Sequence, residues 1–217
     1  MKQMKQYVVI GCGRFGASVA KTLYELGHDV LVIDNNEEII QHISDSVTHA
    51  VQADATDDEV LKSLGIRNFD VAVITIGSNA QSSTMATLIA KEMGVKYVVA
   101  KANSEIHAKI LYKIGADRVV FPERDMGMRV AHNLVSSNIL DYIELAPDYS
   151  IMEIVALDEW LGKTLLEIDI RSKYGVNVMA IKHEHEINVS PISMDRIQNG
   201  DVLVVIGHNK DLKKLEK

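Results

Sequence analysis

The chain has 217 residues, a formal net charge of −7, 47% hydrophobic residues and 24% charged residues. This composition is typical of a folded protein with a packed core and argues against a disordered one. The negative charge also argues against a nucleic-acid groove, which needs clustered Lys and Arg to neutralise phosphates.

In the first half of the chain, short apolar runs alternate with amphipathic segments. Near-continuous Val and Ile runs are typical of parallel strands that are covered on both faces. Repeated strand–helix alternation therefore predicts an α/β fold with a Rossmann-like, doubly wound parallel sheet. Strands are expected at 7–11, 29–34, 48–53, 70–77, 97–102 and 117–122, and helices at 14–26, 37–44, 57–64, 79–93, 104–114 and 124–137.

The pattern changes near Leu140. The stretch 140–150, "LDYIELAPDYS", contains one of only three prolines and is expected to be a connector. The segment beyond it predicts a small α+β module of about 70 residues, which suits regulation better than catalysis. Strands are expected at 150–157, 177–183, 186–190 and 201–207, and helices at about 162–167 and in the tail at 210–217.

The first expected strand runs into the turn Gly11-Cys12-Gly13-Arg14-Phe15-Gly16. In such a turn the first glycine permits the tight bend, the second lets a phosphate approach, and the third lets the helix pack on the strand. Backbone N–H groups and the positive end of the following helix attract the anion. Asp34 ends the next strand, where a carboxylate accepts hydrogen bonds from ribose hydroxyls. Cys12, the only cysteine, is expected to be a small apolar filler.

Arg14 distinguishes this turn from those of most dinucleotide enzymes, because its guanidinium could bind further phosphate oxygens. It favours a chain of phosphates, ATP or ADP, beside the more usual NAD. A solvated surface arginine is the alternative.

Three other strand ends are expected at the same edge of the sheet. Asp54 and Thr56 could meet an adenine edge or a ribose, Gly77 allows close approach, and Lys101 is aimed at phosphate. Either Ser78 or Asn79 is expected to cap the next helix. The expected nucleotide site also includes the flanking residues Phe15, Asn35, Ala55, Ile76 and Ala102.

The histidines do not support catalysis. A dehydrogenase needs a proton-transfer group over the nicotinamide, and the eight histidines are scattered without an acidic partner at convincing spacing. The tract "KHEHE" at 182–186 is expected to be a solvated turn, and no metal site is expected there. The chain is expected not to be an enzyme. A soluble NAD-dependent oxidoreductase and an adenine-nucleotide sensor that acts on an unrelated enzyme are the alternatives.

Five blocks of sequence carry a resemblance to a known family. "VVIGCGRFGASVAKTLYELGHDVLVID", "ADATD", "LGIRNFDVAVITIGSN", "KIGADRVVFPERDMGMRVA" and "DIRSKYGVNVMAIKH" occur in this order. Together they resemble the cytosolic RCK (KTN, TrkA-type) subunits of bacterial Ktr/Trk potassium uptake systems. The resemblance implies a non-catalytic regulator that forms a homodimer, assembles into a homo-octameric ring, and gates a membrane-embedded potassium-translocating subunit.

The resemblance implies ATP or ADP, with NAD(H) as a further ligand, at the glycine turn. Glu123 matches a position that helps to hold a divalent cation at the nucleotide phosphates, and Mg²⁺ suits one carboxylate plus phosphate oxygens. A first-turn helix acid is the alternative for Glu123. Residues 1–123 are expected to form the nucleotide-binding RCK_N domain, 124–145 the crossover helix and connector, and 146–217 the RCK_C (TrkA_C) domain. The apolar positions of the crossover helix, expected to be packing surface, are Met126, Met128, Val130, Leu134 and Val135.

For the C-terminal module, the resemblance implies inhibitory cyclic di-AMP in the cleft between two copies. Arg171 could meet a phosphate, oriented by Asp169, and Asn177 could meet a base edge. A plain dimer interface is the alternative. The remaining residues of this expected site, which would wall the adenines or flank them, are Ile168, Ile170, Val178 and Pro191. The resemblance also implies a cytoplasmic protein docked on the membrane through its transporter partner.

Overall fold

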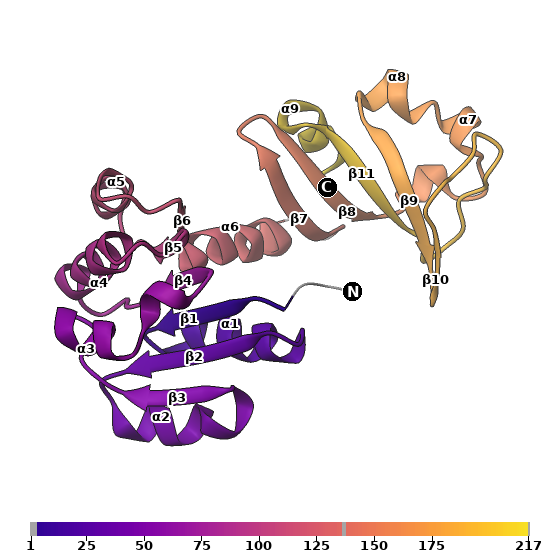
Figure 1. The fold of residues 1–217 in the computed structure, drawn as a ribbon. Helices are drawn as coiled ribbons and strands as arrows, with labels where there is room; N and C mark the ends of the chain where they lie inside the picture. The colour runs from indigo at the N-terminus through magenta and orange to yellow at the C-terminus, as the bar shows by residue number, and fades with distance from the viewer. Residues whose placement is uncertain (1–3, 136–137, 217) are drawn as a thin grey trace. The chain divides into compact units, whose positions relative to one another are not determined.

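The computed structural model describes residues 4–135 and 138–216 and divides the chain into two compact units, Met1–Pro122 and Glu123–Lys217 (Figure 1). Each unit has its own sheet; the first unit has a buried core on each face of its sheet, and the second unit has one of its own. Within the described residues, no helix is long and apolar enough to cross a membrane.

The first unit is built on a six-stranded sheet of order β3-β2-β1-β4-β5-β6, and every strand pair is parallel. The strand order reverses between β1 and β4, which is the arrangement of a doubly wound fold. The predicted fold class is confirmed. The elements are β1 (Gln6–Ile10), α1 (Arg14–Glu25), β2 (Asp29–Asp34), α2 (Glu37–Ile43), η1 (Ser44–Ser46), β3 (His49–Gln52), α3 (Asp58–Ser63), η2 (Ile66–Asn68), β4 (Val71–Ile74), α4 (Ala80–Glu92), β5 (Tyr97–Lys101), α5 (Glu105–Lys113) and β6 (Arg118–Val120).

Alternate residues of the strands enter two separate cores. Val8 and Ile10 face a core that includes side chains of α3, α4 and α5, whereas Val9 faces a smaller core made with α1 and α2. The sheet is therefore apolar on both faces, as its continuous Val and Ile runs predict. Helix starts follow from the sequence as well, because Asn36, Asp57 and Asn79 each accept backbone N–H bonds at an N-cap.

The second unit begins with α6 (Pro122–Val135), whose first residue belongs to the first unit. It continues with a five-stranded sheet of order β10-β9-β11-β8-β7, in which every strand pair is antiparallel. The expected helix over 124–137 runs to Val135, and residues 136–137 lie outside the described residues. The remaining elements are β7 (Ile139–Ala146), β8 (Tyr149–Val155), η3 (Asp158–Trp160), α7 (Leu165–Ile168), α8 (Ile170–Tyr174), β9 (Asn177–His183), β10 (Glu186–Asn188), β11 (Val202–His208), α9 (Asn209–Leu212) and η4 (Lys213–Leu215).

The expectation of a connector at 140–150 is wrong. This stretch forms most of β7, which pairs with β8 across a turn that contains Pro147. The proline therefore lies between two strands and breaks neither. The single helix expected near 162–167 is replaced by the short helices α7 and α8, which meet at Asp169, a residue in the left-handed conformation with φ 52°.

Candidate functional site

The turn between β1 and α1 depends on two glycines. Gly11 has a φ of +90°, and a Cβ there would lie 2.9 Å from the backbone nitrogen of Ile76. A Cβ on Gly16 would overlap the Gly11 carbonyl oxygen and lie 2.5 Å from Thr75 Oγ1. The Thr75 hydroxyl donates a hydrogen bond to the Gly11 carbonyl oxygen. The end of β4 and the start of α1 therefore hold the turn from two sides.

Gly13 leaves space where a phosphate is expected. It is the N-cap of α1, and a Cβ at this position would meet nothing within 4 Å. Among the described residues, no side chain caps this end of α1, and the first turn of the helix carries no acidic residue. The first backbone N–H groups of α1 and the positive end of its dipole are thus available to an anion. Arg14, the first residue of α1, is exposed beside them.

The carboxylate of Asp34 lies at the glycine turn. Its Oδ2 accepts a hydrogen bond of 2.6 Å from the Cys12 backbone N–H, and its Oδ1 accepts one of 2.9 Å from the Asn36 N–H. The β2 end and the β1–α1 turn are therefore joined at the place where a ribose is expected. Burial, with the nearby Asp34 carboxylate, raises the pKa of the Cys12 thiol to about 11, so this buried thiol stays neutral as a filler should.

The loop that follows β3 is held by hydrogen bonds between Thr56 and Asp54. Thr56 donates to Asp54 Oδ1 from its backbone nitrogen at 2.9 Å and from its hydroxyl at 2.7 Å. These two hydrogen bonds from Thr56 lower the pKa of Asp54, because they stabilise the carboxylate. Asp54 remains exposed, whereas Ala55 is buried in the core. Asn35, at the end of β2, is tied to the same region by its carbonyl oxygen, which accepts a bond from Gln52.

Lys101, at the end of β5, reaches the end of β4. A Cβ built on Gly77 would lie 3.1 Å from Lys101 Nζ, so the ammonium group lies directly over the Gly77 backbone. Ser78 is exposed, and Asn79, the other of the two expected caps, accepts the N–H bonds at the start of α4. Ile76 and Ala102 pack in the core and contribute backbone rather than side chains to this edge.

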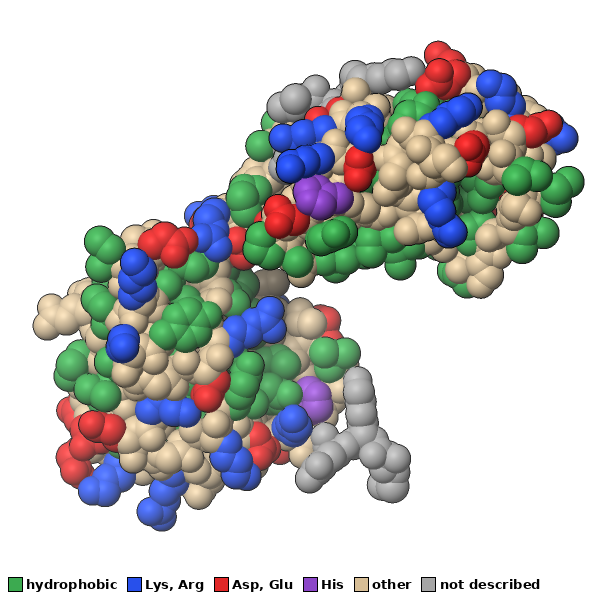
Figure 2. All heavy atoms as spheres, turned by 90° about the horizontal axis from the view of Figure 1, so that it is seen from above, with side chains coloured by type: hydrophobic (Ala, Val, Ile, Leu, Met, Phe, Trp, Pro, Cys, Tyr) green, Lys and Arg blue, Asp and Glu red, His purple; other side chains and the backbone are tan. Residues whose placement is uncertain are grey.

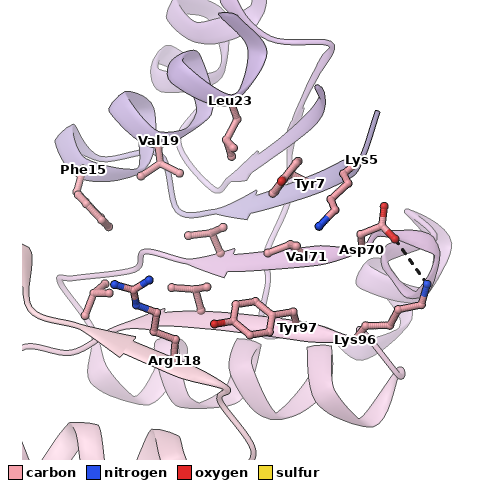
Figure 3. A pocket seen from close by; sticks show the side chains of 13 residues that line it. Lys5, Tyr7, Phe15, Val19, Leu23, Asp70, Val71, Lys96, Tyr97 and Arg118 are labelled. Atoms are coloured by element: carbon pink, nitrogen blue, oxygen red, sulfur yellow. Dashed lines mark ion pairs between the residues drawn. The ribbon is translucent and has the colours of Figure 1, made fainter. Parts of the chain in front are cut away.

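One predicted residue of the nucleotide site, Phe15, lies apart from this edge. Phe15 points from α1 toward a hollow of about 650 Å³ that lies over β4, β5 and β6, where Val71, Tyr97 and Val99 also line it (Figure 3). This hollow lies on one face of the sheet and not at the carboxyl ends of its strands. Glu123 lies in the first turn of α6 and belongs to the second unit.

The C-terminal residues predicted to bind a dinucleotide divide into two groups. Ile168 and Ile170 are 2% and 6% exposed and belong to the core, whereas Arg171 and Asn177 are exposed. Asp169 accepts a hydrogen bond of 2.7 Å from the Ser172 hydroxyl, so its carboxylate contacts Ser172 rather than the expected Arg171. Val178 packs against the core, and Pro191 is partly buried.

Sequence reasoning missed several residues. Thr75 follows β4 in the middle of an apolar run, and only the close approach of two backbones shows its role at the turn. Leu166 and Ile192 are 63% and 62% exposed, and α7 is joined to the loop of Ile192 by a hydrogen bond of 2.9 Å from the Leu166 N–H to the Ser193 carbonyl oxygen. These exposed apolar side chains, and not the buried Ile168 and Ile170, are available to contact another molecule.

The comparisons with known proteins match both units. Residues 7–122 match the TrkA-N domain and residues 150–217 the TrkA-C domain. The chain is 48% identical to the Ktr system potassium uptake protein C of Bacillus subtilis, over 98% of this chain and 96% of that protein. It belongs to the RCK (TrkA-type) family of Ktr regulatory subunits.

Two further similarities agree with this assignment. The Ktr system potassium uptake protein A of B. subtilis is 45% identical over 98% of this chain and 96% of that protein. The solved structure of a GsuK channel bound to NAD has the same fold, with a TM-score of 0.69 and 17% identity over 99% of this chain. This Ktr-family chain spans only 39% of that channel chain.

Proposed function

We propose that this protein is the nucleotide-sensing gating subunit of a potassium uptake transporter and that it binds ATP or ADP, and also NAD(H), at the carboxyl edge of the first sheet. The observation that carries the proposal is the space at Gly13, next to the uncapped end of α1 and the carboxylate of Asp34. This arrangement offers N–H donors to phosphates and a carboxylate to a ribose.

The charges at this edge favour a ligand with several phosphates. Arg14 is exposed at the start of α1, and Lys101 Nζ lies over Gly77. Two cations at this edge of the sheet suit the charge of ATP or ADP. The GsuK channel that shares this fold is described as bound to NAD, which supports NAD(H) as a further ligand.

A cation would bind with the nucleotide. Within the described residues, no group of three or more His, Cys, Asp or Glu side chains could hold a metal ion. Mg²⁺ would therefore take most of its oxygen ligands from phosphates and water, with Glu123 as the proposed protein ligand. ATP affinity that falls when Mg²⁺ is removed, and falls less in Glu123→Gln, would support this role.

Apolar surfaces on the first sheet and on α6 support the proposal that the protein forms a homodimer. This homodimer would assemble into an octameric ring. On one face of the first sheet, α1 and α2 cover β1 and β2, while the half formed by β4, β5 and β6 lines the 650 Å³ hollow (Figure 3). On α6, the exposed apolar residues include Met126 and Leu134, which are 54% and 80% exposed. We propose that α6 of a second copy covers the hollow. Figure 2 also shows hydrophobic side chains exposed between the charged ones on the surface of both units.

The second unit is proposed to bind cyclic di-AMP at the interface of two copies. Arg171 and Asn177 are exposed and could meet a phosphate and a base edge. Leu166 and Ile192 offer the apolar surface on which adenines could lie. A plain dimer interface is the alternative, and it predicts that Arg171→Ala leaves cyclic di-AMP affinity unchanged.

The protein is proposed to act on its membrane partner, at the inner face of the membrane, by a change of shape and not by catalysis. A ligand shifts such an equilibrium only by its differential affinity for the two shapes. The alternative, an NAD-dependent oxidoreductase, predicts an absorbance change when NADH is mixed with a suitable substrate. A broad substrate screen that shows turnover would favour that alternative.

The decisive experiment is calorimetric titration of ATP, ADP and NADH into the wild-type protein and Gly13→Ala. A methyl group at Gly13 has room in the protein, but it would occupy the space proposed for the phosphate. Binding is expected to weaken at least about tenfold while the fold persists. Gly127→Ala, the same change at a roomy position on α6, is the control. Equal affinity of wild type and Gly13→Ala would contradict the proposed site.

A further inference from the structure

Helix α6 is joined to the second sheet by a two-point ion pair. The Arg129 guanidinium donates from Nε to Asp141 Oδ1 at 2.5 Å and from a second nitrogen to Asp141 Oδ2. Asn133, one helical turn further along α6, donates to the Leu140 carbonyl oxygen at 3.0 Å. Residues four apart lie on one face of a helix. One face of α6 therefore contacts two consecutive residues of β7.

The ion pair continues across the sheet. Asp141 on β7 lies directly opposite Glu153 on β8, and Glu153 Oε1 accepts a bond of 2.5 Å from Lys182 Nζ on β9. Strand β11 lies between β8 and β9, so the lysine side chain reaches across it. The four side chains are 22% to 43% exposed, so they are partly shielded from water.

The order of the charges couples the two pairs. Carboxylates directly opposite each other on paired strands repel. Here each of the two acids has its own cation, and the sequence of charges from α6 to β9 is positive, negative, negative, positive. Removing Lys182 leaves Glu153 uncompensated beside Asp141, which changes the field at the Arg129 pair. The hydrogen bonds from Arg129, together with the charges of Arg129 and Lys182, lower the pKa of Asp141.

We propose that four side chains form a clamp that holds α6 and the five-stranded sheet together as one rigid body: Arg129, Asp141, Glu153 and Lys182. The hinge between the two units then lies at the start of α6. Arg129 and Lys182 then act by holding α6 in place on the sheet. The boundary between Pro122 and Glu123 agrees with this placement. Since α6 begins just after the carboxyl end of β6, a displacement at that edge would move the whole second unit. This regulatory meaning rests on the proposed function, but the clamp itself does not.

The clamp is tested by distances between spin labels in the full-length, ligand-free chain. Labels are placed at Asp125 on α6 and Lys173 on α8, both exposed, in a Cys12→Ala background. The labelled protein is diluted with unlabelled protein, so that only distances within one chain are measured. The wild-type clamp is expected to give one narrow distance distribution.

Five variants distinguish a network of four charges from an isolated Arg129–Asp141 pair. Arg129→Gln and Asp141→Asn are expected to broaden the distribution. Lys182→Gln is expected to broaden it as well, although the ion pair of Lys182 is with Glu153 on β8 and not with a residue of α6. Lys213→Gln, an exposed lysine of the same unit, is the matched control and should stay narrow. The charge exchange Arg129→Asp with Asp141→Arg should restore the narrow distribution, because the new charges alternate along the row.

Two outcomes would overturn the proposal: a broad wild-type distribution, or a Lys182→Gln distribution as narrow as that of the control. Fluorescence of Trp160, the only tryptophan and a core residue of the second unit, shows whether each variant is folded. Added ATP or ADP should leave the Asp125–Lys173 distance unchanged, because both labels belong to one body. Failure of nucleotides to bind would count against the proposed function alone, since the clamp is measured without them.

Discussion

The backbone N–H of Cys12 donates a hydrogen bond of 2.6 Å to Oδ2 of Asp34, so the residue expected to bind a ribose also holds the phosphate turn. The second oxygen of the same carboxylate accepts from the Asn36 N–H, at the N-cap of α2. One side chain therefore joins the β1–α1 turn to the β2–α2 turn. Binding and local stability are expected to be coupled at this residue.

The Asp34→Asn substitution should lower both the affinity for ATP and the stability of the first unit. An asparagine is neutral and has a single acceptor oxygen, so both N–H groups lose a charged partner and one of them faces an amide NH2 group in place of an acceptor. Unfolding of the first unit is expected to become easier by about 1 kcal/mol, and ATP affinity to fall about tenfold. Calorimetry measures both quantities, with Asp45→Asn, an exposed acid after α2, as the control. Unchanged ATP affinity would separate Asp34 from the ligand.

Gly16→Ala should destabilise the first unit by about 2–3 kcal/mol, because the new methyl group would overlap the Gly11 carbonyl oxygen, a backbone atom that has little room to move. Gly13→Ala, three residues earlier, should cost less than about 1 kcal/mol. Differential scanning calorimetry of the full chain distinguishes the two. Trp160 fluorescence should report the same second-unit transition in both variants, and a shift of that transition would contradict the assignment.

The Cys12 thiol should resist alkylation in the folded protein. Burial and the Asp34 carboxylate raise its pKa to about 11, so at neutral pH almost no thiolate is present to react. Iodoacetamide at pH 7.5 should leave the native mass unchanged and modify the denatured chain fully. A Ser78→Cys variant supplies an exposed thiol as the positive control. Rapid labelling of native Cys12 would show that the turn opens.

The Arg129–Asp141 pair should stabilise the second unit at neutral pH and lose its effect in acid. The pKa of Asp141 is lowered in the folded protein by the hydrogen bonds from Arg129. A group with a depressed folded pKa contributes stability above its unfolded pKa of about 4, and this contribution disappears as the pH falls through the lower, folded value.

Urea unfolding followed by Trp160 fluorescence tests this effect. Wild type should be more stable than Asp141→Asn at pH 7, and the difference should shrink as the pH falls from about 5 to about 2. A difference that persists unchanged at low pH would mean that the carboxylate charge plays no part.

The alternating pattern of the first unit was sufficient to predict its strands, because the Val-rich runs of the central strands are buried on both faces. Helices α2, α3 and α4 also follow the capping residues Asn36, Asp57 and Asn79. The glycine turn could also be placed, since the expected order of strand, glycines and helix leaves the chain few alternatives. The neighbours of the turn could not. Thr75 touches Gly11 only because β4 pairs with β1, a contact between residues 64 positions apart.

The second unit was less predictable. Strand β7 carries the exposed side chains Leu140, Ile143 and Leu145, so it lacks the clear alternation that distinguishes a half-buried strand from a loop. Ile168 and Ile170 read as ligand walls from the resemblance, yet a short helix break at Asp169 turns both into the core. Local propensity does not reveal that break, because a non-glycine residue with positive φ is rare.

The strand order of the first sheet has a consequence for synthesis on the ribosome. Strands β1, β2 and β3 are adjacent in both sequence and space, so they can pair as soon as residue 52 has left the exit tunnel. Until Val71–Ile74 follows, the other edge of β1 exposes unpaired N–H and C=O groups along an apolar strand. Nascent chains that stall in this interval would expose this unpaired, aggregation-prone strand edge to one another and to chaperones.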